Sequence, residues 1–248
     1  MPDFGSKSGY TLVEMVIVVV ILGILAAIAA TSLRNSNDVA RTERTKAELE
    51  RLADAIAGDP NTLSGGIRTN FGYIGDVGAL PPNLDALAQN PGLATWQGPY
   101  IYDNVSPDGS SSEYRNDAWG VAYSYSGGIS ITSTGSGDAI TRNIANSVND
   151  LLYNRVSTVV TDLDYTPPGL TWQDSVVLTL TYPNGSGSFR TAAVSPGSDG
   201  LATFDSIPIG LHDLEIIYIP DSDTTHRKVA VNTGEDSYVR IQLPKKLW

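Results

Sequence analysis

A run of nineteen uncharged residues, Met15–Leu33, constrains this chain more than any other feature. A helix of that length spans roughly 28 Å at 1.5 Å per residue, which is close to the hydrocarbon thickness of a bilayer. Starting at Tyr10 extends the apolar segment to 24 residues with one charge, on Glu14. A carboxylate inside such a segment costs about 2.5–3.5 kcal/mol on insertion scales, so it usually has a partner and a function.

Three interpretations of this segment compete. A secretory signal peptide would have Lys7 in its basic region and a cleavage site near Ala29, and a plain membrane anchor would keep the whole helix. Neither of these accounts for Glu14. The third interpretation starts from Gly9-Tyr10-Thr11-Leu12-Val13-Glu14, which resembles the processing site of type IV pilins and of the related pseudopilins of type II secretion.

The resemblance implies that a prepilin peptidase cuts after Gly9 and that Tyr10 becomes an N-methylated N-terminus. The hydrophobic helix is then retained rather than removed. Because a buried α-ammonium is tolerable only beside a carboxylate, Glu14 of one subunit can meet the amine of its neighbour and fix the register of stacked helices. Gly23 matches the family's helix-weakening glycine, whereas Thr31 stands where many pilins have a proline.

After the apolar run the pattern becomes amphipathic. Four apolar residues recur at i, i+3, i+4 and i+7, namely Leu49, Leu52, Ala53 and Ile56. Val39 lies upstream on a related face, and Gly58 with Pro60 ends the pattern. The sequence thus predicts one helix over residues 10–57 whose second half packs on a globular head. The alternative is two helices broken near residues 35–38.

Two motifs in the middle of the chain continue the resemblance. They are Trp96-Gln97-Gly98-Pro99-Tyr100 and Asn116-Asp117-Ala118-Trp119-Gly120. Their order after the processing site is similar to that of the major pseudopilin of type II secretion systems, from residue 10 to about 138. The resemblance implies a small antiparallel sheet on the long helix, with Trp96 and Trp119 as core residues between them.

Pseudopilins of this type hold calcium in a loop after the sheet. The corresponding loop here, residues 133–138, has one carboxylate, Asp138. Two alternatives stay open: a weak calcium site made by Asp138, Asp117 and main-chain carbonyls, or a glycine-rich turn without metal. No cofactor is required under either alternative.

The C-terminal third changes to period two. Residues 139–155 are expected to form a helix from Ile144, Val148, Leu151 and Leu152, which have helical spacing. About seven short strands follow, with turns at Asn184-Gly185 and Asp199-Gly200, which indicates a β-sandwich. The run Gly200–Leu214 resembles carboxypeptidase-regulatory-like, prealbumin-type sandwiches, which are usually non-catalytic.

Together these patterns predict an α+β chain in four parts. Residues 1–9 are a leader peptide and residues 10–33 are the transmembrane half of the N-terminal helix. Residues 34–154 form a pilin-like head in which the helix packs on a small antiparallel sheet. Residues 155–248 form an all-β sandwich.

Composition excludes several kinds of chemistry. With 16 lysines and arginines against 27 acidic residues, the net charge of −11 disfavours a nucleic-acid partner. The chain has no cysteine and two histidines, which excludes disulfides, thiolate nucleophiles and histidine-rich metal centres. The acidic pairs Asp162/Asp164 and Asp221/Asp223 are interpreted as solvated turn residues, and no GxSxG motif is present. An enzyme is therefore not expected.

The resemblance implies a homo-oligomeric filament subunit for type II protein secretion. It would span the bacterial inner membrane once, with its globular part in the periplasm. Its partners would be other pseudopilins, the prepilin peptidase, the inner-membrane assembly platform and membrane lipid. The alternative is a type IV pilus subunit, in an extracellular filament, with an adhesive or carbohydrate-contacting C-terminal module. Tyr165 and Trp172 are the candidate sugar-binding aromatics, and core packing is the stronger expectation for both.

Overall fold

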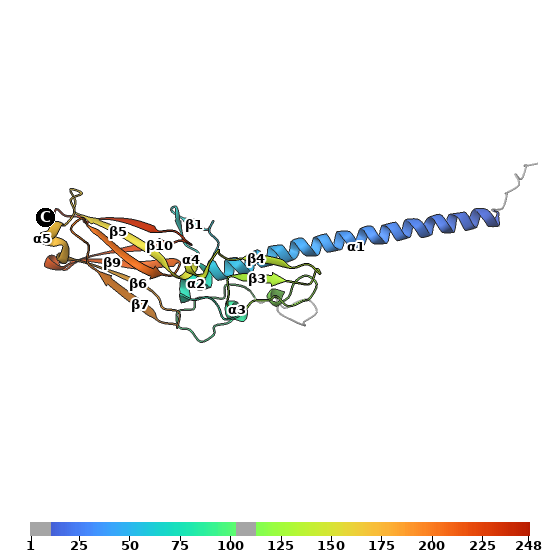
Figure 1. Cartoon of the computed structure of the whole chain (residues 1–248), viewed down its shortest axis with the longest axis horizontal. Helices are drawn as coiled ribbons and strands as arrows, with labels where there is room; N and C mark the ends of the chain where they lie inside the picture. Colours follow the sequence, from blue (N-terminus) through green and yellow to red (C-terminus); the bar gives the residue numbers. More distant parts are fainter. Residues whose placement is uncertain (1–10, 103–112) are drawn as a thin grey trace, which may run out of the picture. The chain divides into compact units, whose positions relative to one another are not determined.

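The computed structural model describes residues 11–102 and 113–248 (Figure 1). The chain divides into two compact units, residues 1–44 and 45–248. The first unit contains most of α1 (Leu12–Ala57), a 46-residue helix about 69 Å long. In the part of the chain that the structure describes, α1 is the one helix long and apolar enough to cross a membrane.

The helix α1 runs without a break through residues 35–38. The prediction of one long helix is therefore confirmed, and the alternative of two helices is wrong. The apolar side chains between Leu12 and Leu33 are exposed. Val39 is exposed as well and does not join the buried stripe further along the helix.

The second unit is built on the last turns of α1. The predicted stripe is buried as expected, at Leu49, Leu52, Ala53 and Ile56. Leu49, Leu52 and Ile56 of the stripe pack in one core with α2 (Gly72–Val77) and α3 (Asp85–Ala88). Ile131 of β3 (Ser130–Ser133) closes this core from the sheet side. The prediction of a long helix packed on a small sheet is confirmed.

The predicted helix over residues 139–155 is wrong in its first half. Residues Ile140–Asn143 form β4, antiparallel to β3, with Ser130 opposite Asn143. The helix α4 is confined to Val148–Leu152 and begins with a capping box between Ser147 and Asp150. The helical spacing of the apolar residues thus extended across two elements, β4 and α4, and the cap at Ser147 separates them. The remaining short elements of the head are the hairpin β1 (Leu63–Ser64) and β2 (Ile67–Arg68), and the 3-10 turn η1 (Glu113–Arg115).

The C-terminal region contains the seven predicted strands. They are β5 (Asn154–Thr161), β6 (Val176–Pro183), β7 (Phe189–Val194), β8 (Leu201–Ile207), β9 (Gly210–Tyr218), β10 (Asp223–Val231) and β11 (Ser237–Gln242). One sheet has the order β10-β9-β6-β7 and the other β11-β5-β8. All pairs are antiparallel except β11 with β5, in which Ser237 lies opposite Val156.

Side chains alternate between the two faces of these strands, and those on the inner face pack between the sheets. Val176, Leu178 and Leu180 of β6 are buried at every second position, as period two requires. The predicted turn glycines Gly185 and Gly200 have positive φ angles of 83° and 80°, which glycine adopts without strain. The sandwich prediction is confirmed at the level of two packed all-β sheets.

The sandwich and the head share main-chain and core contacts. The N–H of Gly185 donates to the carbonyl of Val77 at 2.8 Å, and the N–H of Ile209 donates to Leu151 at 2.9 Å. The Ile209 side chain is fully buried in the head core, although it lies between β8 and β9. The predicted boundary between the head, 34–154, and the sandwich, 155–248, falls at the start of β5 and stays a prediction.

Candidate functional site

Glu14 lies in the first turn of α1 and caps the helix. The main-chain N–H of Thr11 donates to Glu14 Oε2 at 3.1 Å, and the N–H of Glu14 donates to Thr11 Oγ1 at 3.2 Å. The Thr11 hydroxyl also lies 3.2 Å from Oε2. This is a capping box, in which two helix-start donors are satisfied reciprocally. The pattern Thr-x-x-Glu is the signal in the sequence, but the interpretation of Glu14 as an assembly residue overlooked it.

The other predicted processing and assembly residues are placed as follows. Gly9 and Tyr10 lie outside the described residues, so cleavage and methylation there stay predictions. Gly23 lies inside α1, and a Cβ built on it would meet nothing within 4 Å. The helix is continuous at Gly23, and helix weakening at this position also stays a prediction.

Asp117 is buried at the centre of the loop after η1. Its Oδ1 accepts hydrogen bonds from the N–H groups of Trp119 at 3.0 Å and Val121 at 2.9 Å. Its Oδ2 accepts from Ser133 Oγ at 2.6 Å and from the N–H of Gly135 at 3.0 Å. A single carboxylate thus joins the turn at residues 117–120 to the turn after β3.

Burial by itself would raise the pKa of Asp117. The hydrogen bonds from Ser133, Val121, Trp119 and Gly135 outweigh burial and hold the pKa below its usual value. A Cβ on Gly135 would lie 2.4 Å from Asp117 Oδ2, so only glycine fits this close approach. The ionised form of Asp117 is therefore built into the head.

This arrangement bears on the predicted calcium site. Both oxygens of Asp117 already accept two hydrogen bonds, and Asp138 is exposed at the other side of its turn. Among residues 11–102 and 113–248, no group of three or more histidine or acidic side chains could hold a metal ion. The oxygens of Asp117 are thus engaged by donors of the head itself, and calcium at Asp117 and Asp138 stays an untested prediction.

The two tryptophans of the predicted head core differ. Trp96 packs against the head core, its Nε1 donates to the Ala86 carbonyl at 2.8 Å, and its ring meets Tyr100 edge to face. Trp119 is half-buried in the turn that Asp117 holds. The expectation of core packing is confirmed for Trp96 and fails for Trp119.

The expectation of core packing is also wrong for Tyr165 and Trp172 of the sandwich. Tyr165 is 64% exposed and Trp172 is 38% exposed. Tyr165 has a φ of 63°, a left-handed conformation that directs the chain of a non-glycine residue through a strained turn.

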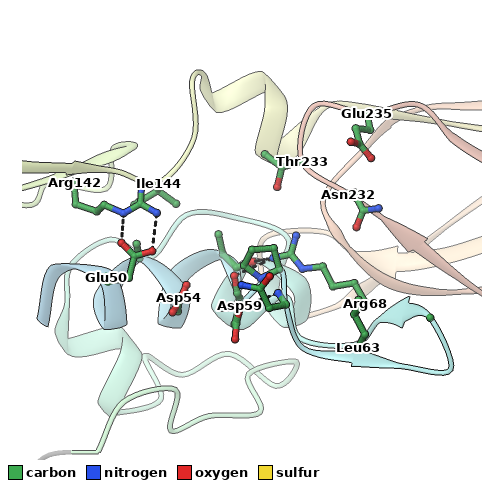
Figure 2. Close-up of a pocket in the computed structure, with 16 residues that line it drawn as sticks. Glu50, Asp54, Asp59, Leu63, Arg68, Arg142, Ile144, Asn232, Thr233 and Glu235 are labelled. Carbon is green, nitrogen blue, oxygen red and sulfur yellow. Dashed lines mark hydrogen bonds and ion pairs between the residues drawn. The ribbon is translucent and has the colours of Figure 1, made fainter. Parts of the chain in front are cut away.

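A cavity of about 680 Å³ lies beside the end of α1, lined by α1, the β1–β2 hairpin, β4 and the β10–β11 loop (Figure 2). Arg142 pairs with Glu50, with distances of 2.5 and 2.9 Å between their N and O atoms. Arg68 donates to the last carbonyls of α1 and is buried. Both cations therefore stabilise the head.

Three further acidic side chains, Asp54, Asp59 and Glu235, line this cavity. Burial raises the pKa of Asp54, and the neighbouring carboxylates of Asp59 and Glu50 raise it further. Asp59 accepts a hydrogen bond from the N–H of Asn61 at 2.8 Å. Glu50 and Asp59 thus make their contacts within the head, and no ligand is assigned to this cavity.

Comparisons with known proteins match the N-terminal motif and about half of the chain. A family model for the prokaryotic N-terminal methylation motif matches residues 5–30. Type II secretion system core protein G of Pseudomonas aeruginosa is 30% identical over 119 residues, which cover 48% of this chain and 72% of that protein. The chain belongs to the core protein G family. The predicted resemblance to the pseudopilins of type II secretion is thereby confirmed.

Two further relatives agree with the family. Core protein G of Xanthomonas campestris pv. campestris is 28% identical over 125 residues, covering 49% of this chain and 78% of that protein. Competence protein ComGC of Halalkalibacterium halodurans is 29% identical over 113 residues, which cover 46% of this chain and 89% of that protein. Each match leaves about half of this member of the core protein G family outside it. The homology and the apolar helix indicate a membrane-anchored subunit.

Proposed function

We propose that the chain is a structural subunit of a helical filament for type II protein secretion, and that it has no catalytic role. The observation that carries the proposal is the homology to core protein G, together with the N-terminal methylation motif matched at residues 5–30. The filament would be rooted in the bacterial inner membrane, with residues 45–248 in the periplasm. Other pseudopilins and the inner-membrane assembly platform would be its partners.

The chemistry at the N-terminus supports this proposal. Cleavage after Gly9 by a prepilin peptidase would leave an α-ammonium on Tyr10, four positions before Glu14. The capping box holds the Glu14 carboxylate at the same end of α1.

Packing many apolar helices together would bring that pair into a medium of low polarity. An isolated charge there is costly, whereas an ammonium and a carboxylate in contact neutralise one another. The Glu14 carboxylate of one subunit would therefore accept the Tyr10 amine of the next and set the axial stagger. The exposed apolar side chains from Leu12 to Leu33 supply the surface that would be buried in lipid and between subunits.

The processing step can be tested directly. Intact-mass and fragment-ion spectra of the full chain purified from membranes of its host should give a chain that starts at N-methylated Tyr10. Gly9→Val should keep the leader and prevent filament formation. Gly5→Val, a matched glycine change inside the leader, should be processed normally. A mature chain that starts downstream of Ala29 would refute the proposal, because the apolar helix would then have been removed.

A further inference from the structure

One end of the sandwich carries four connected segments. Residues 162–175, 195–200, 219–222 and 243–248 link or follow the strands at the same end of both sheets, where α5 (Gly169–Trp172) and the C-terminus lie (Figure 1). We call these four segments the sandwich tip. None of their residues takes part in the contacts with the head described above.

The sandwich tip exposes large apolar side chains. Leu170 is 81% exposed, and Leu163, Tyr165, Trp172 and Ile219 are exposed on the segments of the same tip. Scattered apolar residues are ordinary on a protein surface, but several on one loop cluster indicate a surface that another molecule covers. The sandwich tip therefore exposes apolar surface to solvent.

The loops of the tip are tied to one another. The N–H of Gly169 donates to the carbonyl of Ser198 at 3.0 Å, which joins α5 to the β7–β8 connection. Trp248 Nε1 donates to the Thr166 carbonyl at 2.8 Å, and its ring packs near Tyr218. The exposed apolar groups are thus presented by a braced surface, which lowers the entropy lost when a partner binds.

Tyr165 adds a second indication of a binding surface. Its left-handed φ of 63° is costly for a residue with a bulky side chain. The ring of Tyr165 is exposed to solvent and does not pack in the core. The N–H of Tyr165 donates to the Asp162 carbonyl at 3.1 Å. Strain that buries no apolar surface is typical of residues that contact a partner.

Charge identifies the chemistry of that partner. The sandwich tip, together with Asp223 at the start of β10, contains six aspartates and two lysines, and one of the aspartates, Asp162, is fully buried. The two lysines are paired, Lys245 with Asp223 at 2.9 Å and Lys246 with Asp164 at 2.9 Å. Asp174 and Asp199 are also exposed on the loops of the tip. A surface with a net negative charge and exposed apolar side chains complements a basic, apolar partner.

We propose that the sandwich tip binds a protein segment that carries both large apolar side chains and lysine or arginine. Leu163, Leu170 and Ile219 fit apolar side chains of such a segment, and the aspartates fit its cations. An anionic membrane surface is repelled by the same aspartates. A sugar would stack on Tyr165 and Trp172 and leave the three aliphatic side chains uncovered. The proposal goes beyond the filament function, since it concerns a contact made by the exposed end of the sandwich.

The experiment uses the full chain in phosphatidylcholine nanodiscs, with empty nanodiscs as the reference. The probe is a short synthetic amphipathic peptide of leucine and lysine, and its matched partner has glutamate in place of lysine. The lysine peptide should bind about tenfold more tightly than the glutamate peptide, and rising salt should reduce the difference. Equal binding of the two peptides would overturn the proposal.

Matched variants locate the binding surface. Leu170→Ser and Asp174→Asn should each weaken binding of the lysine peptide by about tenfold. Tyr165→Gly removes the ring and relieves the left-handed strain, so a loss of binding in a folded Tyr165→Gly variant is assigned to the ring. The controls are Phe189→Ser on β7 and Asp236→Asn in the β10–β11 loop, which are exposed outside the tip. Circular dichroism verifies that each variant is folded.

Three further results would overturn the proposal. The first is equal weakening by tip variants and control variants. The second is binding of a cello-oligosaccharide that Tyr165→Gly abolishes and Leu170→Ser leaves unchanged, which would make the tip a sugar site. The third is self-association of the chain that Leu170→Ser abolishes while the lysine peptide fails to bind. Filament formation by the tip variants is scored separately, so that failure of this proposal is distinguishable from failure of the filament proposal.

Discussion

The guanidinium of Arg68 donates to the carbonyl of Ala57 at 2.6 Å, at the last residue of α1. It also donates to the carbonyls of Gly58 at 3.0 Å and Asn70 at 2.9 Å, and it lies 4.5 Å from the centre of the Phe71 ring. A helix leaves its last carbonyls without partners and has a partial negative charge at its C-terminus. Arg68 donates to these carbonyls and places a positive charge beside them, so one side chain of the β1–β2 hairpin stabilises the end of α1.

Replacing Arg68 tests this role. Arg68→Met keeps much of the side-chain volume but leaves buried carbonyls without donors, which should lower the free energy of unfolding by about 2–4 kcal/mol. Arg240→Met on the exposed face of β11 is the matched control and should change it by less than about 0.5 kcal/mol. Chemical unfolding of the full chain in detergent measures both. Equal effects of the two variants would contradict the capping role.

Ile209 tests whether the head and the sandwich unfold together. Ile209→Ala removes a fully buried side chain from the head core and should cost about 2–5 kcal/mol. Amide hydrogen exchange should then accelerate in parallel at Ile131 of the head and Leu178 of the sandwich. Ile219→Ala, at an exposed position, is the control. Faster exchange in the sandwich with unchanged exchange in the head would contradict a shared core.

Asp117 predicts part of the response to acid. Because its pKa in the folded chain lies below the unfolded value of about 3.9, the ionised carboxylate stabilises the fold above that pH. The stabilisation is lost as the pH falls through the lowered folded pKa. Asp117→Asn should therefore reduce stability at neutral pH by about 1–3 kcal/mol.

The same variant should lose less stability than the wild type on acidification, because the titrating group is gone. Unfolding by urea at a series of pH values measures this difference. Asp138→Asn removes an exposed carboxylate and should keep the wild-type response to acid. An Asp117→Asn variant with the full wild-type acid dependence would show that other groups cause it.

The hydrogen bonds of Asp117 also make a prediction about calcium. A ligand that binds only the folded chain raises its melting temperature. Because both oxygens of Asp117 are occupied by donors, calcium and a chelator should give the same melting temperature. A higher melting temperature in calcium, lost in Asp138→Asn, would restore the metal site that the sequence suggested.

The elements that could be predicted from the sequence are those in which buried and exposed positions repeat at a regular spacing along the chain. The stripe that includes Leu49 and Ile56 has helical spacing on one face, and the structure buries that face. Along β6 every second residue is buried, which period two anticipates. Asn184-Gly185 and Asp199-Gly200 mark turns because glycine accepts their positive φ angles. Each of these signals lies within a few neighbouring residues.

The features that the sequence did not predict depend on distant partners. Residues 140–143 pair with β3 instead of continuing into α4, and apolar spacing alone could not separate the strand from the helix. The parallel pairing of β11 with β5 joins segments about eighty residues apart. The cap that Arg68 forms on α1 needs the hairpin to fold back. Tyr165 and Trp172 are aromatic residues that usually pack inside, and a strained turn and an exposed short helix place them outside.

Glu14 offers the most direct test of the central claim, because the structure gives it a second role. As the N3 residue of a capping box, Glu14 stabilises the start of α1, and glutamine can replace it in that role. Glu14→Gln therefore keeps the cap and removes the charge, whereas Glu14→Ala removes both. Asp38→Asn, an acidic position of α1 beyond the apolar segment, is the control.

The measurement is the yield of filaments seen by electron microscopy in cells that produce each variant at equal levels. If the Glu14 carboxylate neutralises the Tyr10 amine of a neighbouring subunit, Glu14→Gln should form as few filaments as Glu14→Ala, and Asp38→Asn should form them at the wild-type level. Wild-type filaments from Glu14→Gln would contradict the account, since the cap alone would then be sufficient for assembly.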